Sequence, residues 1–350
     1  MADIADLYKG TGISKDQLSD DGEPCILYGE LYTKYKSETI REVVSKTNID
    51  NTKLVRSKAN DVIIPCSGET AEDIATARCV LNDNILLGGD LNIIRLHGYD
   101  GAFMSYQLNG KRKYDIAKVA QGVSVVHLYG EHLKGVKTMN PCLEEQKKIA
   151  SLLALLDERI ATQNKIIDKL QSLIKGIAQK IVRSNKPNVR LSECLECNSS
   201  TLQESDVCEH GTYPVYGANG IVGYLNNYNT EGEAVYIIKD GSGVGIVSYV
   251  TGKCSATGTL NTLQAKEGYS LQYFYYLLKV FNFQPYKTGM AIPHIYFKDY
   301  GKAKVFCPSY TEQLQYARLL SAIDTKLLIE QNILTKLSLQ KQYLLRQMFI

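Results

Sequence analysis

The sequence predicts an α+β protein in which two mixed α/β domains are separated by two long helices. Three observations predict this fold: the second half of the chain repeats the first, each repeat ends in a heptad-patterned segment, and short strand and helix patterns precede each of these segments. At 350 residues the chain has room for about two domains. We expect the helices to pair antiparallel as an intramolecular coiled coil, which would give the chain an internal pseudo-twofold symmetry.

The repeat aligns residues 122–181 with residues 289–348 at a constant offset of 167 and without a gap. A repeat this long that occurs only twice indicates two similar domains, each followed by a similar helix, rather than a solenoid. Fourteen of the 60 aligned positions are identical: Gly122/Gly289, His127/His294, Tyr129/Tyr296, Lys137/Lys304, Pro141/Pro308, Glu145/Glu312, Gln146/Gln313, Ala150/Ala317, Leu152/Leu319, Leu153/Leu320, Asp157/Asp324, Ile166/Ile333, Lys169/Lys336 and Leu170/Leu337.

Both long helices are predicted to begin in the same way, with a proline followed by Glu145-Gln146 or Glu312-Gln313. An apolar stripe then steps by three and four residues, as in a coiled coil. In an alternative interpretation, each helix packs only on its own domain. The stripes are Leu153, Leu156, Ile160, Gln163, Ile167, Leu170, Ile174, Ile177 and Ile181, and Leu320, Ile323, Leu327, Glu330, Leu334, Leu337, Lys341, Leu344 and Met348.

These signals divide the chain into four predicted segments. The first domain covers residues 1–140, the first helix 141–183, the second domain 184–307 and the second helix 308–350. Within the domains, residues 25–31, 61–65, 84–96, 234–238 and 245–250 are predicted to be strands, the last two joined by a hairpin turn. Residues 71–79, 113–120 and 270–281 are predicted to be helices.

Charge and hydropathy exclude several classes of protein. The net charge is only +3, which argues against a nonspecific polyanion binder, although residues 141–190 carry 10 basic and 5 acidic side chains. The chain contains no apolar run of about eighteen residues, so no transmembrane helix is predicted. The first ten residues lack the pattern of a signal peptide. We expect a cytoplasmic protein.

The nine cysteines are odd in number and scattered, which does not predict a disulfide framework. Cys194 and Cys197 have metal-ligand spacing, and Cys208 and His210 lie near them in sequence. A zinc site is one interpretation of this group, and reduced cysteines without a metal are the favoured one. We therefore expect no bound metal.

No sequence motif predicts a catalytic site. P-loop, HExxH and GxSxG patterns do not occur, and five histidines are too few to outline a catalytic group. A glycine-rich stretch at 241–245 has a weak likeness to a cofactor loop, but it falls in the predicted hairpin. We expect no bound cofactor and a protein that binds rather than catalyses.

The motif that closes each domain combines glycine, histidine and tyrosine. Glycine allows close approach of a partner, whereas histidine and tyrosine offer hydrogen-bonding tips. If these loops face nucleic acid they would contact phosphates; alternatively the histidine caps buried backbone in a structural turn. Adding nearby basic and polar loop residues gives the candidate contact set: Ser67, Gly68, Lys111, Arg112, Lys113, Gly122, His127, Tyr129, Tyr216, Asn219, Gly220, Lys287, Gly289, His294 and Tyr296.

The doubled pattern resembles the specificity subunits of type I restriction–modification systems. The likeness rests on Pro141-Cys-Leu-Glu-Glu145-Gln146, on Pro308-Ser-Tyr-Thr-Glu312-Gln313 and on the loop that precedes each of them. The segments at 64–70 and 213–220 are also similar to recognition-domain segments of that family. The resemblance covers essentially the whole chain.

This resemblance implies a noncatalytic reader of double-stranded DNA whose two target-recognition domains each recognise half of a bipartite site. The paired helices would set the spacer and dock two methyltransferase subunits, which methylate adenine with S-adenosylmethionine. Restriction subunits with ATP and Mg²⁺ would join the complex. Two other hypotheses are a stand-alone DNA-binding regulator or adaptor, and a self-sufficient methyltransferase, which the missing catalytic motif disfavours.

Overall fold

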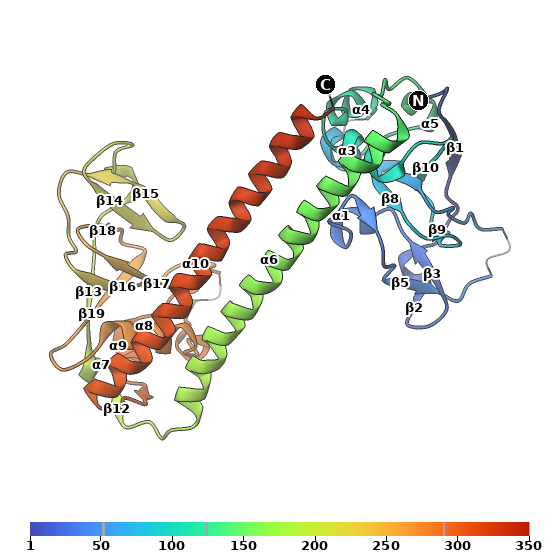
Figure 1. The fold of residues 1–350 in the computed structure, drawn as a ribbon. Coiled ribbons are helices and arrows are strands. Elements are labelled where there is room, and N and C mark those ends of the chain that lie inside the picture. The colour runs from blue at the N-terminus through green and yellow to red at the C-terminus, as the bar shows by residue number, and fades with distance from the viewer. Residues whose placement is uncertain (51–52, 123–124, 290, 350) are drawn as a thin grey trace. The chain divides into compact units, whose positions relative to one another are not determined.

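The computed structural model describes residues 1–50, 53–122, 125–289 and 291–349 (Figure 1). The chain forms two compact units. Unit 1 contains Met1–Asn164 and Asn332–Ile350, and unit 2 contains Lys165–Gln331, so each unit holds one α/β domain and part of both long helices. Among the described residues, no helix combines the length and apolar character needed to cross a membrane.

Unit 1 is built on two sheets and a two-stranded ladder. Its strands are β1 (Ala5–Lys9), β2 (Leu18–Ser19), β3 (Glu23–Ile26), β4 (Thr39–Ile40), β5 (Ser45–Thr47), β6 (Asp61–Pro65), β7 (Ser67–Gly68), β8 (Arg78–Val80), β9 (Leu86–Leu87), β10 (Leu91–Leu96) and β11 (Val126–His127). One sheet has the order β1-β10-β6-β8-β4, the other has the order β2-β5-β3-β9, and β11 pairs with β7.

Unit 1 also contains short helices. They are η1 (Lys15–Gln17), α1 (Glu30–Thr33), α2 (Ala71–Ile74), α3 (Gly101–Asn109), α4 (Lys113–Val119) and α5 (Gly130–Lys134). Of these, α3 packs on β6 and β8. All five residues of β6 are buried, and alternate side chains enter different cores. Val62 and Ile64 pack with Met104 and Leu108 of α3, whereas Ile63 packs in a second cluster.

Unit 2 is likewise built on small sheets with short helices. Its strands are β12 (Val189–Arg190), β13 (Leu195–Ser199), β14 (Tyr213–Gly217), β15 (Gly220–Leu225), β16 (Glu233–Ile238), β17 (Val247–Thr251), β18 (Ser255–Ala256), β19 (Leu260–Ala265) and β20 (Lys304–Val305), and its short helices are α7 (Leu191–Cys194), η2 (Glu204–Asp206), α8 (Leu271–Lys279), η3 (Gln284–Tyr286) and α9 (Phe297–Tyr300). The sheet orders are β13-β19-β16-β17, β15-β14-β18 and β12-β20.

A strand followed by a nine-residue helix is common to the two units. In unit 1, β10 leads to α3, whose first turn is capped by Asp100; in unit 2, β19 leads to α8, which is capped by Ser270. Each helix packs against its sheet, with Phe274 and Leu278 of α8 beside Val235 and Leu263. The two domains therefore share this structural element although their loops differ.

The long helices are α6 (Leu143–Arg183) and α10 (Tyr310–Gln347), each beginning two residues after the start of its predicted segment. In unit 1 the beginning of α6 packs with the end of α10, through Leu153 and Leu344. In unit 2 the end of α6 and the beginning of α10 share one core, which includes Ile181 and Ala317. The pairing within each unit is antiparallel, as predicted, and no position of either predicted stripe is exposed.

The alternative in which each helix packs only on its own domain is wrong. The end of α10, which belongs to the second repeat, packs on the first domain: the rings of Phe103 in α3 and Phe349 are 5.2 Å apart between centroids. An added carbon on Gly110, in the same domain, would lie 2.7 Å from the carbonyl oxygen of Leu345. The core of unit 1 therefore requires both repeats.

Several predicted elements are confirmed, and three need correction. The strand at 61–65, the helices near 113–120 and 270–281, and the hairpin of β16 and β17 are present. The predicted strand 25–31 ends at Ile26 because a turn leads into α1, where the Glu30 carboxylate accepts from the backbone N–H of Leu27. The predicted helix 71–79 ends at Ile74 because Arg78–Val80 pairs with β6, and the predicted strand 84–96 is divided at Gly88-Gly89-Asp90.

Candidate nucleic-acid interface

The two closing loops are defined here as residues 121–129 in unit 1 and 288–296 in unit 2, of which residues 123–124 and 290 lie outside the described part of the chain. Their ends are paired in the same way. Gln121 and His127 exchange two backbone hydrogen bonds of 2.9 and 2.7 Å, and Thr288 and His294 do the same at 2.9 and 2.7 Å. The loop in each unit is therefore closed by a hydrogen-bonded pair at the same two positions of the repeat.

In each loop a glycine with left-handed backbone conformation follows the first residue of this hydrogen-bonded pair. Gly122 has φ +127° and Gly289 has φ +87°. A side-chain carbon on Gly122 would lie 2.0 Å from the carbonyl oxygen of Val125, and one on Gly289 would lie 2.3 Å from that of Ile292. Only glycine fits these positions, because both the φ angle and the available space exclude a Cβ.

Each closing-loop histidine is held by a side chain that differs between the repeats. The Nδ1 atom of His127 is 3.3 Å from the hydroxyl of Ser67, whereas the Nδ1 atom of His294 is 2.7 Å from the carboxylate of Asp240. Ser67 and His127, two members of the candidate contact set, lie together because β7 and β11 are paired. Asp240, which takes the place of Ser67 beside the histidine of unit 2, is not in the candidate contact set.

A half-exposed tyrosine accompanies each histidine. Tyr129 stacks on His127 with centroids 6.2 Å apart, and Tyr296 stacks on His294 at 6.5 Å. The two tyrosines are 51% and 46% exposed, and Lys298 lies 5.2 Å from the centroid of the Tyr296 ring. Each loop can therefore present a phenol to a partner, with a cation beside it in unit 2.

The basic run of unit 1 is only partly available for binding. Lys111 is exposed, and Lys113 begins α4. Arg112 is largely covered, and its guanidinium lies 3.4 Å from the carboxylate of Asp115. Among these three residues, Lys111 has the free access to solvent that a phosphate contact needs.

The candidate residues in the first half of unit 2 form a tight hairpin. Gly220 pairs with Gly217 and has φ +102°, which closes a two-residue turn that exposes Asn219. Tyr216 instead turns toward Tyr236, with centroids 5.6 Å apart, and burial raises the pKa of its phenol. Lys287 is half-buried at the start of the other loop.

Unit 1 has a cavity of about 800 Å³ beside its closing loop. Its walls combine Ser67 and Gly68 of β7 with Tyr28 and Tyr32 and with Val125. The hydroxyl of Tyr32 donates to the carbonyl oxygen of Ser67 at 3.1 Å, and burial raises the pKa of this phenol above its ordinary range. The cavity thus brings residues of the candidate contact set together with tyrosines that are not in that set.

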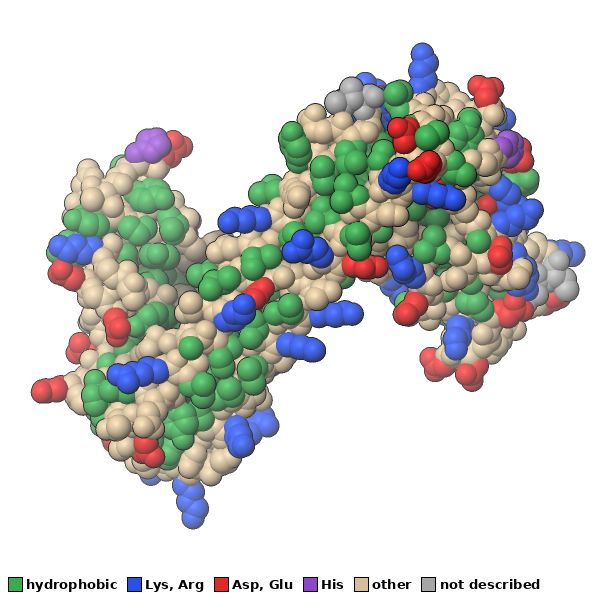
Figure 2. All heavy atoms as spheres, in the orientation of Figure 1, with side chains coloured by type: hydrophobic (Ala, Val, Ile, Leu, Met, Phe, Trp, Pro, Cys, Tyr) green, Lys and Arg blue, Asp and Glu red, His purple; other side chains and the backbone are tan. Residues whose placement is uncertain are grey.

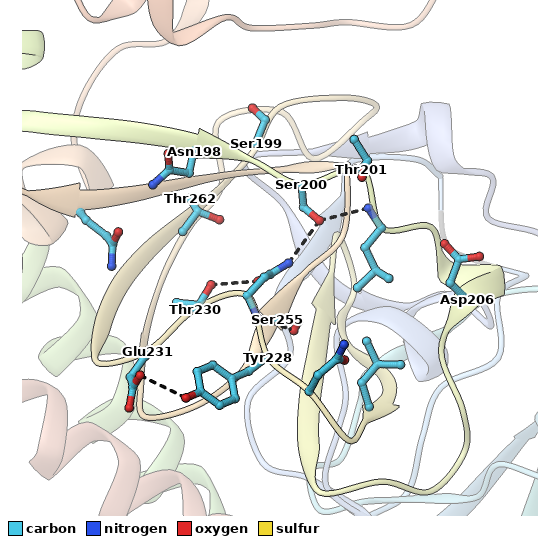
Figure 3. A pocket seen from close by; sticks show the side chains of 15 residues that line it. Asn198, Ser199, Ser200, Thr201, Asp206, Tyr228, Thr230, Glu231, Ser255 and Thr262 are labelled. Carbon is cyan, nitrogen blue, oxygen red and sulfur yellow. Dashed lines mark hydrogen bonds between the residues drawn. The ribbon is translucent and has the colours of Figure 1, made fainter.

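Unit 2 has a cavity of about 510 Å³ lined mainly by hydroxyl and amide side chains (Figure 3). Asn229 is central: its amide nitrogen is 3.2 Å from the Ser200 hydroxyl, and its amide oxygen accepts from Thr230 at 3.1 Å. Asp206 and Glu231 also line it, and the lining includes no lysine or arginine. This chemistry suits base edges, which hydroxyl, amide and carboxylate groups can read, better than it suits phosphates.

The glutamine of each Glu-Gln pair fixes its long helix to the domain in front of it. The side chain of Gln146 donates to the carbonyl oxygen of Pro141 at 2.7 Å and accepts from the backbone N–H of Asp100 at 2.9 Å. Gln313 makes the same two bonds, to Pro308 and Ser270, both at 2.9 Å. Asp100 and Ser270 are the N-caps of α3 and α8, so the start of each long helix is tied to the start of a domain helix.

A second repeated bond lies three turns further along each long helix. The phenol of Tyr106 donates to Asp157 at 2.7 Å, and that of Tyr276 donates to Asp324 at 2.9 Å. Burial, and next the charge of the aspartate, raises the pKa of both phenols, so both remain donors near neutral pH. Together with the glutamine bonds, these contacts fix the direction in which each helix leaves its domain.

The cysteines do not form a metal-ligand cluster. Within the described residues, no group of three or more His, Cys, Asp and Glu side chains is placed to hold a metal ion. Cys194 is buried in the core of unit 2, whereas Cys208 is exposed. The zinc interpretation therefore gains no support from the fold.

A groove of about 600 Å³ lies between the long helices within unit 1. Leu152, Leu155 and Leu156 of α6 line one side, and Ile333 and Leu337 of α10 line the other. Leu152 is 50% exposed, and Leu319, which occupies the same place in the repeat, is 51% exposed. Figure 2 shows apolar and basic side chains along the exposed surface of the helices.

Two similar α/β domains with repeated closing-loop ends, each tied to a long helix, define a protein built from two related halves. A family model described as the type I restriction modification DNA specificity domain matches residues 1–172 and again residues 184–339. The chain therefore belongs to this family.

Known relatives agree with this assignment. The chain is 28% identical over 113 residues to the type I restriction enzyme EcoprrI specificity subunit of Escherichia coli, covering 32% of this chain and 28% of that protein. It is 27% identical over 179 residues to the MjaVIII specificity subunit of Methanocaldococcus jannaschii, covering 51% and 40%. The chain thus aligns with less than half the length of these relatives.

Solved structures share the fold. The S subunit of a type I restriction–modification system from M. genitalium superposes with a TM-score of 0.71 at 20% identity, covering all of this chain and 94% of that one. A chain from a structure that addresses complex assembly and conformational transition of a type I system has a TM-score of 0.56 at 14% identity, covering 98% and 95%.

Sequence reasoning missed residues that only the fold brings together. Asp240 and His294 are 54 residues apart in sequence, and the lining of the unit 2 cavity comes from four separate segments. Val125 and Ile292 are different residue types, so identity between the repeats did not mark them. Val125 and Ile292 are nevertheless 167 residues apart, the offset of the repeat, and this equivalence was the signal that could have identified them.

Proposed function

We propose that this chain recognises DNA sequence for a type I restriction–modification complex, with each domain reading one half of a bipartite site. One observation carries the proposal: the two units keep the same closing loops and helix attachments, whereas the polar side chains around those loops differ. Such a protein would bind two different base sequences, one at the equivalent position of each domain.

The polar cavities support a role in base readout. The unit 2 cavity offers Asn198, Asn229 and Gln264, and amides of this kind pair with adenine. The unit 1 cavity offers Ser67 and Thr33 together with tyrosines. Because the two sets differ in residue type, the two half-sites would differ in sequence. We propose that the fifteen residues of the candidate contact set also contribute to the DNA-binding surfaces.

The long helices would set the distance between the half-sites and dock methyltransferase subunits. Each unit exposes a leucine at the same place in the repeat, Leu152 or Leu319, and in unit 1 this leucine borders an apolar groove. An exposed leucine is ordinary, but its repetition indicates a contact made twice. Two methyltransferase subunits would fit this arrangement. Restriction subunits would join the complex, and S-adenosylmethionine, ATP and Mg²⁺ would bind to these partners.

The test is co-expression with a type I methyltransferase subunit from the same organism, followed by genome-wide mapping of methylated adenine. We expect a split motif with a fixed gap that is absent when this chain is omitted. A complex that assembles without producing new methylation would contradict the proposal and favour a stand-alone DNA-binding protein. Methylation by this chain alone would instead support a self-sufficient methyltransferase.

A further inference from the structure

An exposed β-branched apolar side chain occupies the same place in both closing loops. Val125 is 51% exposed and Ile292 is 59% exposed, and each lies two residues before the loop histidine. Single exposed apolar residues are common on protein surfaces. Here, however, the same type of side chain recurs at an offset of 167, in loops whose left-handed glycine and paired ends also recur.

Around the closing loops, some side chains are the same in both units and others differ, and we expect the two kinds to recognise different features of DNA. The side chain that holds the histidine changes from Ser67 to Asp240, whereas the histidine, the tyrosine and the apolar residue keep their character. Variable positions would recognise what differs between the two half-sites. Repeated positions would contact what the half-sites have in common.

The location of Val125 favours DNA over a protein partner, and Ile292 occupies the equivalent place in the repeat. Val125 lines the unit 1 cavity together with Ser67 and Tyr28, so it shares a surface with candidate base-reading groups. The apolar groove that we assign to protein docking lies on the long helices and has its own repeated leucine. An exposed apolar side chain beside the hydroxyl of Ser67 and the phenol of Tyr28 suits the one apolar group on a base edge, the thymine methyl.

We propose that Val125 and Ile292 each contact the thymine methyl of the A·T pair that carries the adenine to be methylated. This inference rests on the proposed function, under which both half-sites contain such a pair. Thymine is the partner of the modified adenine in either half-site, so one residue type can serve both. Adjacent variable side chains would then read the bases that differ.

The test replaces that thymine with deoxyuridine, which removes the methyl group and keeps the base pair. It uses the complex of the full chain with its methyltransferase subunit, and duplexes that carry the mapped motif at fixed salt concentration. For the unaltered chain we expect about fourfold weaker binding for each replacement, the effect of losing one buried methyl group. Val125→Ala should abolish the response in the first half-site only, and Ile292→Ala in the second half-site only.

Val44→Ala is the matched control, because Val44 is 66% exposed in unit 1 and lies outside the closing loop. It should keep the full response to deoxyuridine. The proposal is overturned if Val125→Ala responds like the unaltered chain, or if it binds DNA normally but loses the methyltransferase subunit. Absence of any mapped motif with the unaltered chain would contradict the proposed function itself, which separates the two failures.

Discussion

The ammonium group of Lys341 lies 2.6 Å from the carboxylate of Glu38, and it is equally close to the carboxylate of Asp157. All three side chains are largely buried in unit 1, with exposed fractions of 15%, 8% and 11%. Lys341 belongs to α10 and Glu38 to the first domain, so this ion cluster fastens the end of the second repeat to the first. Ile174 occupies the equivalent position in α6 and is buried without a charge.

Replacing Lys341 with methionine should lower the free energy of unfolding by about 3 to 5 kcal/mol, because two buried carboxylates lose their cation. Denaturant unfolding followed by circular dichroism measures this loss. The triple variant Glu38→Gln, Asp157→Asn, Lys341→Met removes all three charges and should recover most of the stability. Equal losses in the single and triple variants would show that packing, rather than charge, accounts for the effect.

Glu38 should also give the stability of unit 1 a pH dependence. Burial raises the pKa of its carboxyl above the ordinary value of 4.5, Lys341 opposes this, and Asp157 adds to it. Between 4.5 and the raised pKa the folded chain holds a proton that the unfolded chain has released. The contribution of this carboxyl is therefore fully present below pH 4.5 and is lost as pH rises through the raised pKa.

Glu38→Gln should remove this dependence. The difference in unfolding free energy between the unaltered chain and the variant, measured at a series of pH values, should decline as pH rises through that window. A flat difference would mean that Glu38 stays ionised in the folded chain across the whole range.

Alanine at Gly122 should disrupt the closing loop of unit 1. The left-handed backbone and the nearby Val125 carbonyl oxygen exclude a Cβ, and we expect a loss of about 1 to 3 kcal/mol in stability together with weaker DNA binding. Gly176→Ala is the opposite control, because Gly176 lies in the exposed face of α6 with open space around it. Removing a helical glycine there should stabilise the chain by about 1 kcal/mol.

Aspartate at Leu152 or at Leu319 should each remove one methyltransferase subunit from the complex, and the double variant should remove both. Both leucines are half-exposed, so a charge there should leave folding intact while preventing an apolar contact. Native mass spectrometry measures the stoichiometry directly. Leu328→Asp is the matched control, since Leu328 is 59% exposed but has Ala161 at the equivalent position in the repeat. If it had the same effect, the repeated leucines would have no special role.

The long helices and the doubled domains were predictable because helical periodicity and repetition are local patterns in the chain. The first domain was harder: residues 84–96 are rich in leucine and isoleucine and read as one strand, but Gly88-Gly89-Asp90 divides them into strands of two different sheets. The ion cluster could not be foreseen either. Lys341 looked like a break in the stripe, and its partner Glu38 lies 303 residues away in sequence. A contact of this kind depends on the fold and leaves no mark in nearby residues.

Lengthening both long helices by seven residues should lengthen the gap in the methylated motif without changing either half-site. Insertions after Asn164 in α6 and after Gln331 in α10 fall at the boundaries of the two units. One heptad preserves the apolar stripe and adds about 10.5 Å of helix, which corresponds to roughly three base pairs at about 3.4 Å each. Mapping of methylated adenine measures the new gap. An insertion in α6 alone should put the stripes out of register and abolish methylation, whereas a changed half-site would mean that the helices do more than set a distance.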